Sequence, residues 1–196
     1  MVLKIFEAGE LVLRVPAREL SRQEILSAHT QELIASMFET MRAAPGVGLA
    51  APQVGIGLQL AVIEDRAEFI SKLPANQAAE RLREAVEPHV IINPILTLEA
   101  DDHNVQFFEG CLSLPGFTAI VPRALAVRVD CLNERAEPVT IHARGWYARI
   151  LQHEIDHLHG TLYIDRMLTR SFMGRENFER YWSGAPIGET RRLLCG

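Results

Sequence analysis

Residues 151–160, L-Q-H-E-I-D-H-L-H-G, contain the pattern that decides both the fold and the chemistry of this chain. His153 and His157 are four residues apart, so on a helix both imidazoles lie on one face and can bind a single cation. Glu154 follows the first histidine and is well placed to reach a water on that cation. This is the His-Glu-x-x-His arrangement of hydrolytic metal sites. The competing interpretation is an amphipathic helix that carries the pattern by chance.

Composition limits the class of protein. The chain has 196 residues, of which 48% are hydrophobic, and its formal net charge is -5. We therefore expect one domain with a sizeable core, and the charge predicts no nucleic-acid partner. No apolar run approaches the ~20 residues that span a bilayer, so no membrane partner is expected either.

The cysteines and the N-terminus indicate a compartment. Cys111, Cys131 and Cys195 are an odd number at irregular spacing, with no C-x-x-C pair. They predict free thiols in a reducing compartment rather than a disulfide framework. The first residues carry acids and lack the basic start and apolar core of a signal peptide. We expect a cytoplasmic protein.

A long N-terminal helix is the first strong element. Residues 1–20 are expected to be an extended arm, and Ser21 with Glu24 forms a capping box. From there an amphipathic run continues to Pro45, which predicts a single long helix. Its apolar face is expected to carry Ile25, His29, Leu33, Met37 and Met41, with Leu26, Ile34 and Phe38 beside it.

Strands are expected through the middle of the chain, and Pro94 indicates a bulge or a sheet edge in the second of them. The expected strands are residues 58–64, 90–98 and 105–108, followed by a hairpin of 124–132 with 139–143. The charged, Ala-rich residues 65–87 are expected to be a variable insertion with a short helix over 76–86.

The helix that carries the two histidines is expected to begin at Gly145 and to end at Gly160, which acts as its C-terminal cap. Residues 167–196 then form a mixed, Gly-rich tail. Consecutive strands flanked by two strong helices predict an α+β fold. We expect a single domain over residues 1–196, with mostly antiparallel sheets packed around a central metal-binding helix and with a long N-terminal helix.

Two histidines do not complete a catalytic site, which usually has three protein ligands and one open position. The metzincin pattern fails because Tyr163 stands where its last histidine must be. Glu176 lies downstream of His157 at a spacing that thermolysin-like proteases allow. Cys111 lies in an E-G-C-L-S turn. As a ligand it would supply a thiolate, and otherwise it would be a small buried apolar residue. The residues by themselves leave Glu176 and Cys111 as alternatives.

Three stretches, in this order, resemble the signature motifs of the peptide deformylases. They are G-V-G-L-A-A-P-Q (46–53), E-G-C-L-S (109–113) and Q-H-E-I-D-H-L-H-G (152–160). Further segments are similar to the branch that includes organellar and some bacterial deformylases, namely residues 115–117, 145–150, 165–167 and 170–172. A bacterial member is expected, because no transit segment is apparent.

The resemblance implies a metal-dependent hydrolase that removes the formyl group from the N-terminal formyl-methionine of new polypeptides and releases formate. It implies that Cys111, His153 and His157 bind one divalent metal ion. That ion is usually ferrous iron, and zinc, nickel or cobalt can occupy the same site. The implied partners are N-formyl-methionyl nascent peptides, and proximity to the ribosome is a family expectation.

The resemblance also assigns the catalytic groups. Glu154 would act as the general acid and base. The side-chain amide of Gln53 and the backbone N–H of Leu112 would stabilise the oxyanion. Glu109 and Arg123 are expected to pair and to brace the cysteine loop.

Substrate positions complete the assignment. Val47 and Gly48 are expected to pair with the substrate backbone, and Gly110 allows the main chain a close approach. Trp146, Arg149 and Ile150 match positions that line the methionine pocket. For Arg149 we expect the aliphatic stem to line the pocket while the charge reaches water.

Two other functions remain open from the sequence. One is a zinc endopeptidase of the His-Glu-x-x-His type, with Glu176 as the third ligand. The other is a non-catalytic module that binds peptide or metal on the same fold. Because both Gln53 and Glu154 are present, the sequence favours an enzyme over the module.

Overall fold

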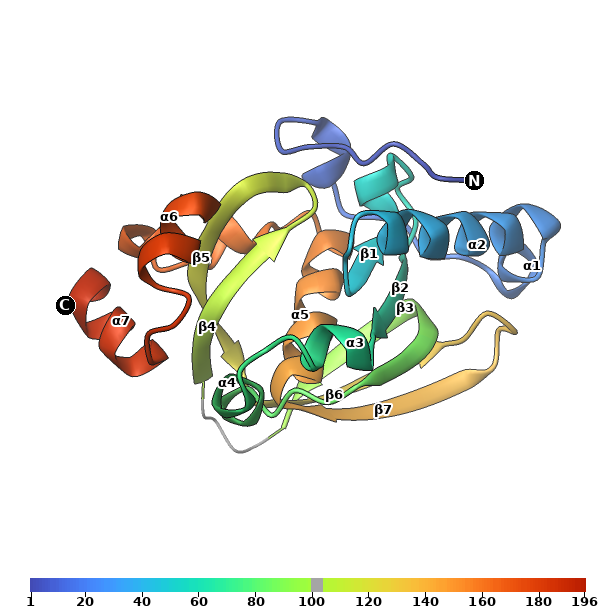
Figure 1. The fold of residues 1–196 in the computed structure, drawn as a ribbon. Coiled ribbons are helices and arrows are strands. Elements are labelled where there is room, and N and C mark those ends of the chain that lie inside the picture. Colours follow the sequence, from blue (N-terminus) through green and yellow to red (C-terminus); the bar gives the residue numbers. More distant parts are fainter. Residues whose placement is uncertain (100–103) are drawn as a thin grey trace.

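The computed structural model describes residues 1–99 and 104–196, and it confirms the α+β class. Two antiparallel sheets flank a central helix, α5 (Gly145–Leu158) (Figure 1). The larger sheet has the order β1 (Gly48–Ala50), β2 (Leu60–Asp65), β3 (Val86–Leu98), β6 (Ala126–Leu132) and β7 (Pro138–Arg144). The smaller sheet has the order β4 (Asn104–Cys111), β5 (Leu114–Ala124) and β8 (Met173–Gly174).

The five-stranded sheet is covered on both faces because its side chains alternate. On β2, Leu60 and Val62 pack toward the N-terminal helix α2 (Ala28–Ala43), in a core cluster with Met37. Ala61 and Ile63 point the other way and pack with α5, whose buried face includes Leu151. The central helix is therefore fixed to the larger sheet by apolar burial, and its opposite face is free to carry polar groups.

The predicted long N-terminal helix is confirmed as α2, but its expected start at Ser21 is wrong, because a separate short helix, α1 (Arg22–Ile25), precedes it. The capping box of Ser21 with Glu24 is confirmed. A second cap interrupts the helix, since the Ser27 hydroxyl accepts a hydrogen bond from Thr30 N–H at 3.3 Å. The break changes the helical phase, so Leu26 and His29 are exposed instead of lying on the buried face.

The predicted bulge at Pro94 is confirmed. The pairing of β3 with β6 shifts register between Ile92 and Ile95, and Asn93 adopts a φ of 50°. β3 nevertheless lies inside the sheet, between β2 and β6, rather than at its edge. The hairpin of β6 with β7 is also as predicted.

Strand β5 was missing from the sequence prediction, because Pro115, Gly116 and Pro122 resemble loop residues. Residues 65–87 form two short helices, α3 (Ala67–Ile70) and α4 (Ala75–Glu80), so the single helix expected over 76–86 is wrong. The tail contains α6 (Arg175–Tyr181) and α7 (Ile187–Cys195), which lie outside β5 (Figure 1). Short 3-10 turns occupy Leu11–Leu13, Ala51–Val54, Tyr163–Asp165 and Thr169–Ser171.

The ends of α5 agree with the sequence. The helix begins at Gly145, and Gly160 follows its last turn with a left-handed φ of 74°. A Cβ at Gly160 would lie 2.7 Å from the Arg14 backbone, so glycine also allows the N-terminal arm to pass close by. Among the described residues, no helix is both long and apolar enough to span a bilayer.

The packing of α5 on the sheet predicts that Leu151→Ala is strongly destabilising. Leu151 is fully buried, so its truncation should lower the free energy of unfolding by about 2–5 kcal/mol in urea denaturation. Leu193, on α7, has 62% of its surface exposed and is the matched control, expected to change stability by less than about 0.5 kcal/mol. Equal effects of the two substitutions would contradict this description of the core.

Candidate metal centre

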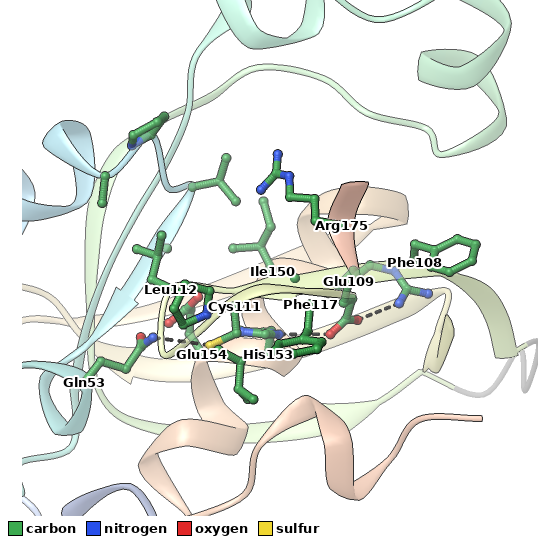
Figure 2. Close-up of a pocket in the computed structure, with 18 of the residues that line it drawn as sticks. Gln53, Phe108, Glu109, Cys111, Leu112, Phe117, Ile150, His153, Glu154 and Arg175 are labelled. Carbon is green, nitrogen blue, oxygen red and sulfur yellow. Dashed lines mark hydrogen bonds and ion pairs between the residues drawn. The ribbon is translucent and has the colours of Figure 1, made fainter. Parts of the chain in front are cut away.

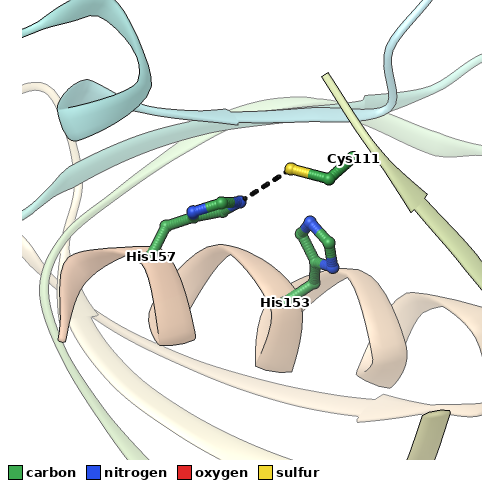
Figure 3. A group of neighbouring side chains, drawn as sticks. All are labelled: Cys111, His153 and His157. Carbon is green, nitrogen blue, oxygen red and sulfur yellow. Dashed lines mark hydrogen bonds between the residues drawn. The ribbon is translucent and has the colours of Figure 1, made fainter. Parts of the chain in front are cut away.

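Cys111, His153 and His157 meet at one point, as Figure 3 shows. One ligand atom of each lies within 4.8 Å of the other two, and Cys111 Sγ is 3.2 Å from His157 Nε2. The cysteine ends β4, while the two histidines lie one turn apart on α5. A thiolate and two imidazoles at this spacing suit a divalent cation bonded to all three.

Two further observations fit a metal with a water beside it. His153 Nδ1 is 2.9 Å from Glu109 Oε2, which leaves its Nε2 free for a cation, the usual carboxylate–histidine–metal arrangement. Glu154 Oε2 is buried with no hydrogen-bond partner among the described residues. A buried carboxylate oxygen without a partner is costly unless a water or cation faces it. The donor set and the unpartnered oxygen therefore fit a hydrolytic metal site.

Burial shapes the charge of these groups. It raises the pKa of Glu154 to about 7, so this carboxyl gains and loses a proton easily near neutral pH. Burial lowers the pKa of His157 well below its usual value, which keeps the imidazole neutral, the form that binds metal.

Gly48 is required by the position of Glu154. A Cβ at residue 48 would lie 2.2 Å from Glu154 Oε1 and 2.8 Å from its Cγ. Strand β1 thus passes directly against the carboxylate, and only glycine permits that approach. The first sequence motif and the metal helix are in contact through this pair.

Gln53 lies with its amide group fixed. Its Oε1 accepts from Ala50 N–H at 2.9 Å, so Nε2 must face the other way, toward Ser113 Oγ at 3.2 Å and Cys111 Sγ at 3.5 Å. Leu112 starts the turn between β4 and β5. Just before it the strand pairing is irregular, because the register shifts between Glu109 and Cys111. The Leu112 N–H lies outside that pairing, next to the cysteine.

Glu109 is the centre of a buried ion cluster, and its predicted pairing with Arg123 is confirmed. The Arg123 guanidinium donates to both carboxylate oxygens at 2.9 and 3.0 Å. Arg149 donates to the same carboxylate at 2.6 Å. Burial alone would raise the pKa of Glu109, but Arg123 and His153 outweigh it and hold that pKa well below its usual range. The carboxylate therefore stays charged beside the metal ligands.

The cluster continues through Asp156, which the sequence analysis missed. Arg123 Nη1 lies 2.5 Å from Asp156 Oδ2, and Arg166 donates to both oxygens of the same aspartate at 2.6 and 2.7 Å. Asp156 stands three residues after His153 on α5, and this helical spacing was the available signal. Through Arg123, the aspartate ties α5 to β5.

The expected exposure of the Arg149 charge is wrong. Only 2% of Arg149 is exposed, and its guanidinium donates to Glu109 and to the carbonyls of Val105 and Val121. Burial lowers the pKa of Arg149 to about 10, while Glu109 opposes that shift. The arginine is a structural cation held by these three partners.

A cavity of about 500 Å³ collects the predicted site residues (Figure 2). Every one of them except His157 lines it: Val47, Gly48, Gln53, Gly110, Cys111, Leu112, Trp146, Arg149, Ile150, His153 and Glu154. His157 lies behind them, 1% exposed. The cavity lies between β1 and β4, each of which is an edge strand of its sheet.

Three other wall residues were not assigned to the site from the sequence, although Phe117 belongs to the segment 115–117 that carries part of the family resemblance. Phe108, Phe117 and Arg175 line the same cavity, and they come from β4, β5 and α6. Glu176, the alternative third ligand, is exposed on α6 and does not belong to the cluster of metal-binding groups. The structure therefore brings Cys111, not Glu176, to the histidines.

Comparison with known proteins agrees with this site. The profile of the family described as polypeptide deformylase matches residues 2–172. The chain belongs to this family. It is similar to the chloroplastic peptide deformylase 1A of Solanum lycopersicum, with 46% identity over 175 residues, which cover 89% of this chain and 63% of that protein. The chain thus spans less than two thirds of that relative.

Bacterial deformylases match over more of their length. Peptide deformylase 3 of Streptomyces avermitilis is 43% identical over 194 residues, covering 99% of this chain and 84% of that protein. A solved class I type b peptide deformylase of Acinetobacter baumannii, with Met-Ala-Ser bound, is similar in structure. Its TM-score is 0.75 at 34% identity, covering 85% of this chain and 99% of that one.

Metal binding by this chain should depend on Cys111 and not on Glu176. Even the loss of a partner behind a ligand typically weakens metal binding about 10–100-fold. Cys111→Ala should therefore weaken it about 100-fold or more in competition with a chelator, while Glu176→Ala leaves it unchanged. If Glu176→Ala weakened metal binding and Cys111→Ala did not, Glu176 would be the third ligand, as in thermolysin-like proteases.

Proposed function

We propose that this chain hydrolyses the formyl amide of N-formyl-methionyl peptides and releases formate. The observation that carries the proposal is the Cys111–His153–His157 cluster, with the unpartnered Glu154 carboxylate beside it, at one end of a cavity between two strand edges. The names of the family and of its relatives support it.

Cys111, His153 and His157 would hold the metal ion. When bound, the ion supplies Lewis acidity for the formyl oxygen and lowers the pKa of a water ligand. A set of one thiolate and two imidazoles suits several divalent ions. Among them we propose ferrous iron, the ion that the sequence resemblance implies, with zinc, nickel and cobalt as ions that the same donors accept.

The two strand edges would bind the substrate backbone. An extended peptide between β1 and β4 can form strand pairs with both, as in β-strand addition. Val47 and Gly48 would contact it from one side and Gly110 from the other, and all three line the cavity. The peptide bound to the Acinetobacter relative, Met-Ala-Ser, is what would remain of such a substrate after its formyl group is removed.

The methionine side chain would enter the cavity beside α5. Ile150 is apolar and 4% exposed, and the half-buried Trp146 forms a second wall. The Arg149 stem lies beside them with its charge neutralised by Glu109. An unbranched apolar side chain fits such a wall, and a charged one would lose its water without gaining a partner.

The remaining steps belong to the protein's own groups. Glu154 takes a proton from the attacking water and delivers it to the departing amine as the carbon–nitrogen bond breaks. Gln53 Nε2 and the Leu112 N–H donate to the oxygen on which negative charge develops. The Gln53 amide is oriented before substrate arrives, because its Oε1 accepts from Ala50 N–H.

The proposal includes the cellular compartment in which the protein acts. We place the protein in a bacterial cytoplasm, supported by the Streptomyces relative that matches 99% of this chain, although a chloroplastic relative is also similar. The substrates would be nascent peptides, and proximity to the ribosome stays a prediction.

Glu154→Ala tests the proposed chemistry. General acid–base catalysis typically contributes about 10²–10⁴-fold, so formate release from formyl-Met-Ala-Ser should fall by at least that range. The protein should be purified anaerobically and loaded with iron, and its metal content should match that of the unaltered chain. Normal deformylation by the variant would show that Glu154 is not the base. A fully loaded, unaltered protein that releases no formate would refute the proposed function.

A further inference from the structure

Arg175 brings the C-terminal tail into the substrate cavity. The family match ends at residue 172, and Arg175 is the first residue of α6, just beyond it. The side chain lines the cavity together with Ile150 and Glu109. In Figure 2 its guanidinium lies on the Ile150 side and points away from Glu109. The tail therefore supplies part of the wall.

The fold fixes the backbone from which the Arg175 side chain extends. Strand β8 pairs with β5, with Gly174 opposite Phe117 and Met173 opposite Thr118. On the other side of Arg175, the ring of Phe178 packs on that of Phe108, with centroids 4.6 Å apart. The strand pair and the ring contact hold the start of α6 against the cavity rim.

Among the described residues that line the cavity, Arg175 is the one cationic side chain that is largely exposed. Arg149, the other arginine there, is 2% exposed and bound to Glu109. The remaining charged or titratable lining groups are Glu109, His153, Glu154 and Cys111, all of which belong to the ion cluster or the metal centre. Arg175 has 71% of its side chain exposed, and its partner Glu179 is a solvent-exposed residue one turn along α6. Such a pair is weak, so the guanidinium can exchange it for another carboxylate.

An extended substrate reaches this region within a few residues. Phe108 precedes Cys111 by three positions on β4, and a strand advances ~3.3 Å per residue. A peptide with its formyl group at Cys111 and its backbone along β4 therefore passes the Phe108 level within about three residues of the methionine. Phe108 lines the cavity, as Arg175 does.

We propose that Arg175 makes this deformylase prefer substrates with an acidic side chain at one of the three positions after the formyl-methionine. The inference rests on the proposed function. It assigns the tail a role in selecting substrates and no role in the chemical step. Arg175 is a specificity-determining residue, and its effect should appear in KM rather than in kcat.

The test compares peptides that differ in one charge. The parent peptide is formyl-Met-Ala-Ala-Ala amide, and in each variant Asp or Lys replaces the alanine at the second, third or fourth position. The C-terminal amide removes the competing carboxylate. At one position the Asp peptide should have a kcat/KM about two- to fivefold above the Lys peptide, the scale of exposed ion pairs. The ratio should fall at 0.5 M salt, because exposed charges are screened.

Variants on α6 provide the controls. Arg175→Glu should reverse the preference, and Arg175→Lys should retain it. Arg180→Glu introduces the same charge change on the same helix, at an exposed residue outside the cavity lining, and should leave the ratio unchanged. An equal change in the Arg180 variant would show a long-range charge effect and overturn the assignment.

Two failures are distinguishable. If formate is released from all peptides without a charge preference, or if Arg175→Glu keeps the preference, the role of Arg175 is refuted and the proposed function stands. If no peptide releases formate, the proposed function fails. Fluorescence anisotropy with labelled forms of the same peptides then still tests Arg175, because the Asp peptide should bind more tightly than the Lys peptide only when Arg175 is present.

Discussion

The metal centre depends on one buried carboxylate, that of Glu109. It comes from β4 and accepts from Arg123 on β5 and from Arg149 on α5, and it lies within hydrogen-bonding distance of His153 Nδ1. The smaller sheet and the metal helix are therefore joined by charge, whereas the larger sheet is joined to the helix by apolar packing. Removing one partner from such a network leaves an uncompensated buried charge, which typically costs about 3–5 kcal/mol. The cost makes the relative position of β4 and α5 specific, and with it the position of Cys111 next to the histidines.

Each of the three motifs supplies a part that the others cannot. The first brings Gly48 against Glu154 and aims the Gln53 amide at the cysteine. The second supplies the thiolate and, one residue before its Gly-Cys pair, Glu109. The third supplies two imidazoles and the carboxylate on one helical face. Their meeting in the wall of a cavity whose sides are two strand edges carries the proposed chemistry, because a peptide bound between those edges would have its end at the metal.

The sequence predicted those elements that are determined by residues close together in the chain. The ends of α5 follow from glycines, the hairpin of β6 and β7 from alternation, and the bulge in β3 from Pro94. The helix break at Ser27 was missed because a second cap competes with a continuous apolar face, and β5 was missed because its prolines are tolerated by tertiary packing. The ligands and Glu154 were predictable from motif resemblance, since chemistry fixes their types. For Asp156 the only signal was its helical spacing from His153. Arg175 and the burial of Arg149 were not predictable, because they depend on contacts between distant segments.

Glu109→Gln is the substitution that tests this account most directly, because the amide keeps the shape of the side chain but removes its charge and one acceptor. The measurement is the metal affinity of the folded variant, by competition with a chelator, with near-ultraviolet circular dichroism as the check on folding. If Glu109 orients His153 for the metal, affinity should fall about 10–100-fold while the fold is retained. An unchanged affinity in a folded variant would show that the ligands are held without it and would contradict the central role of this carboxylate.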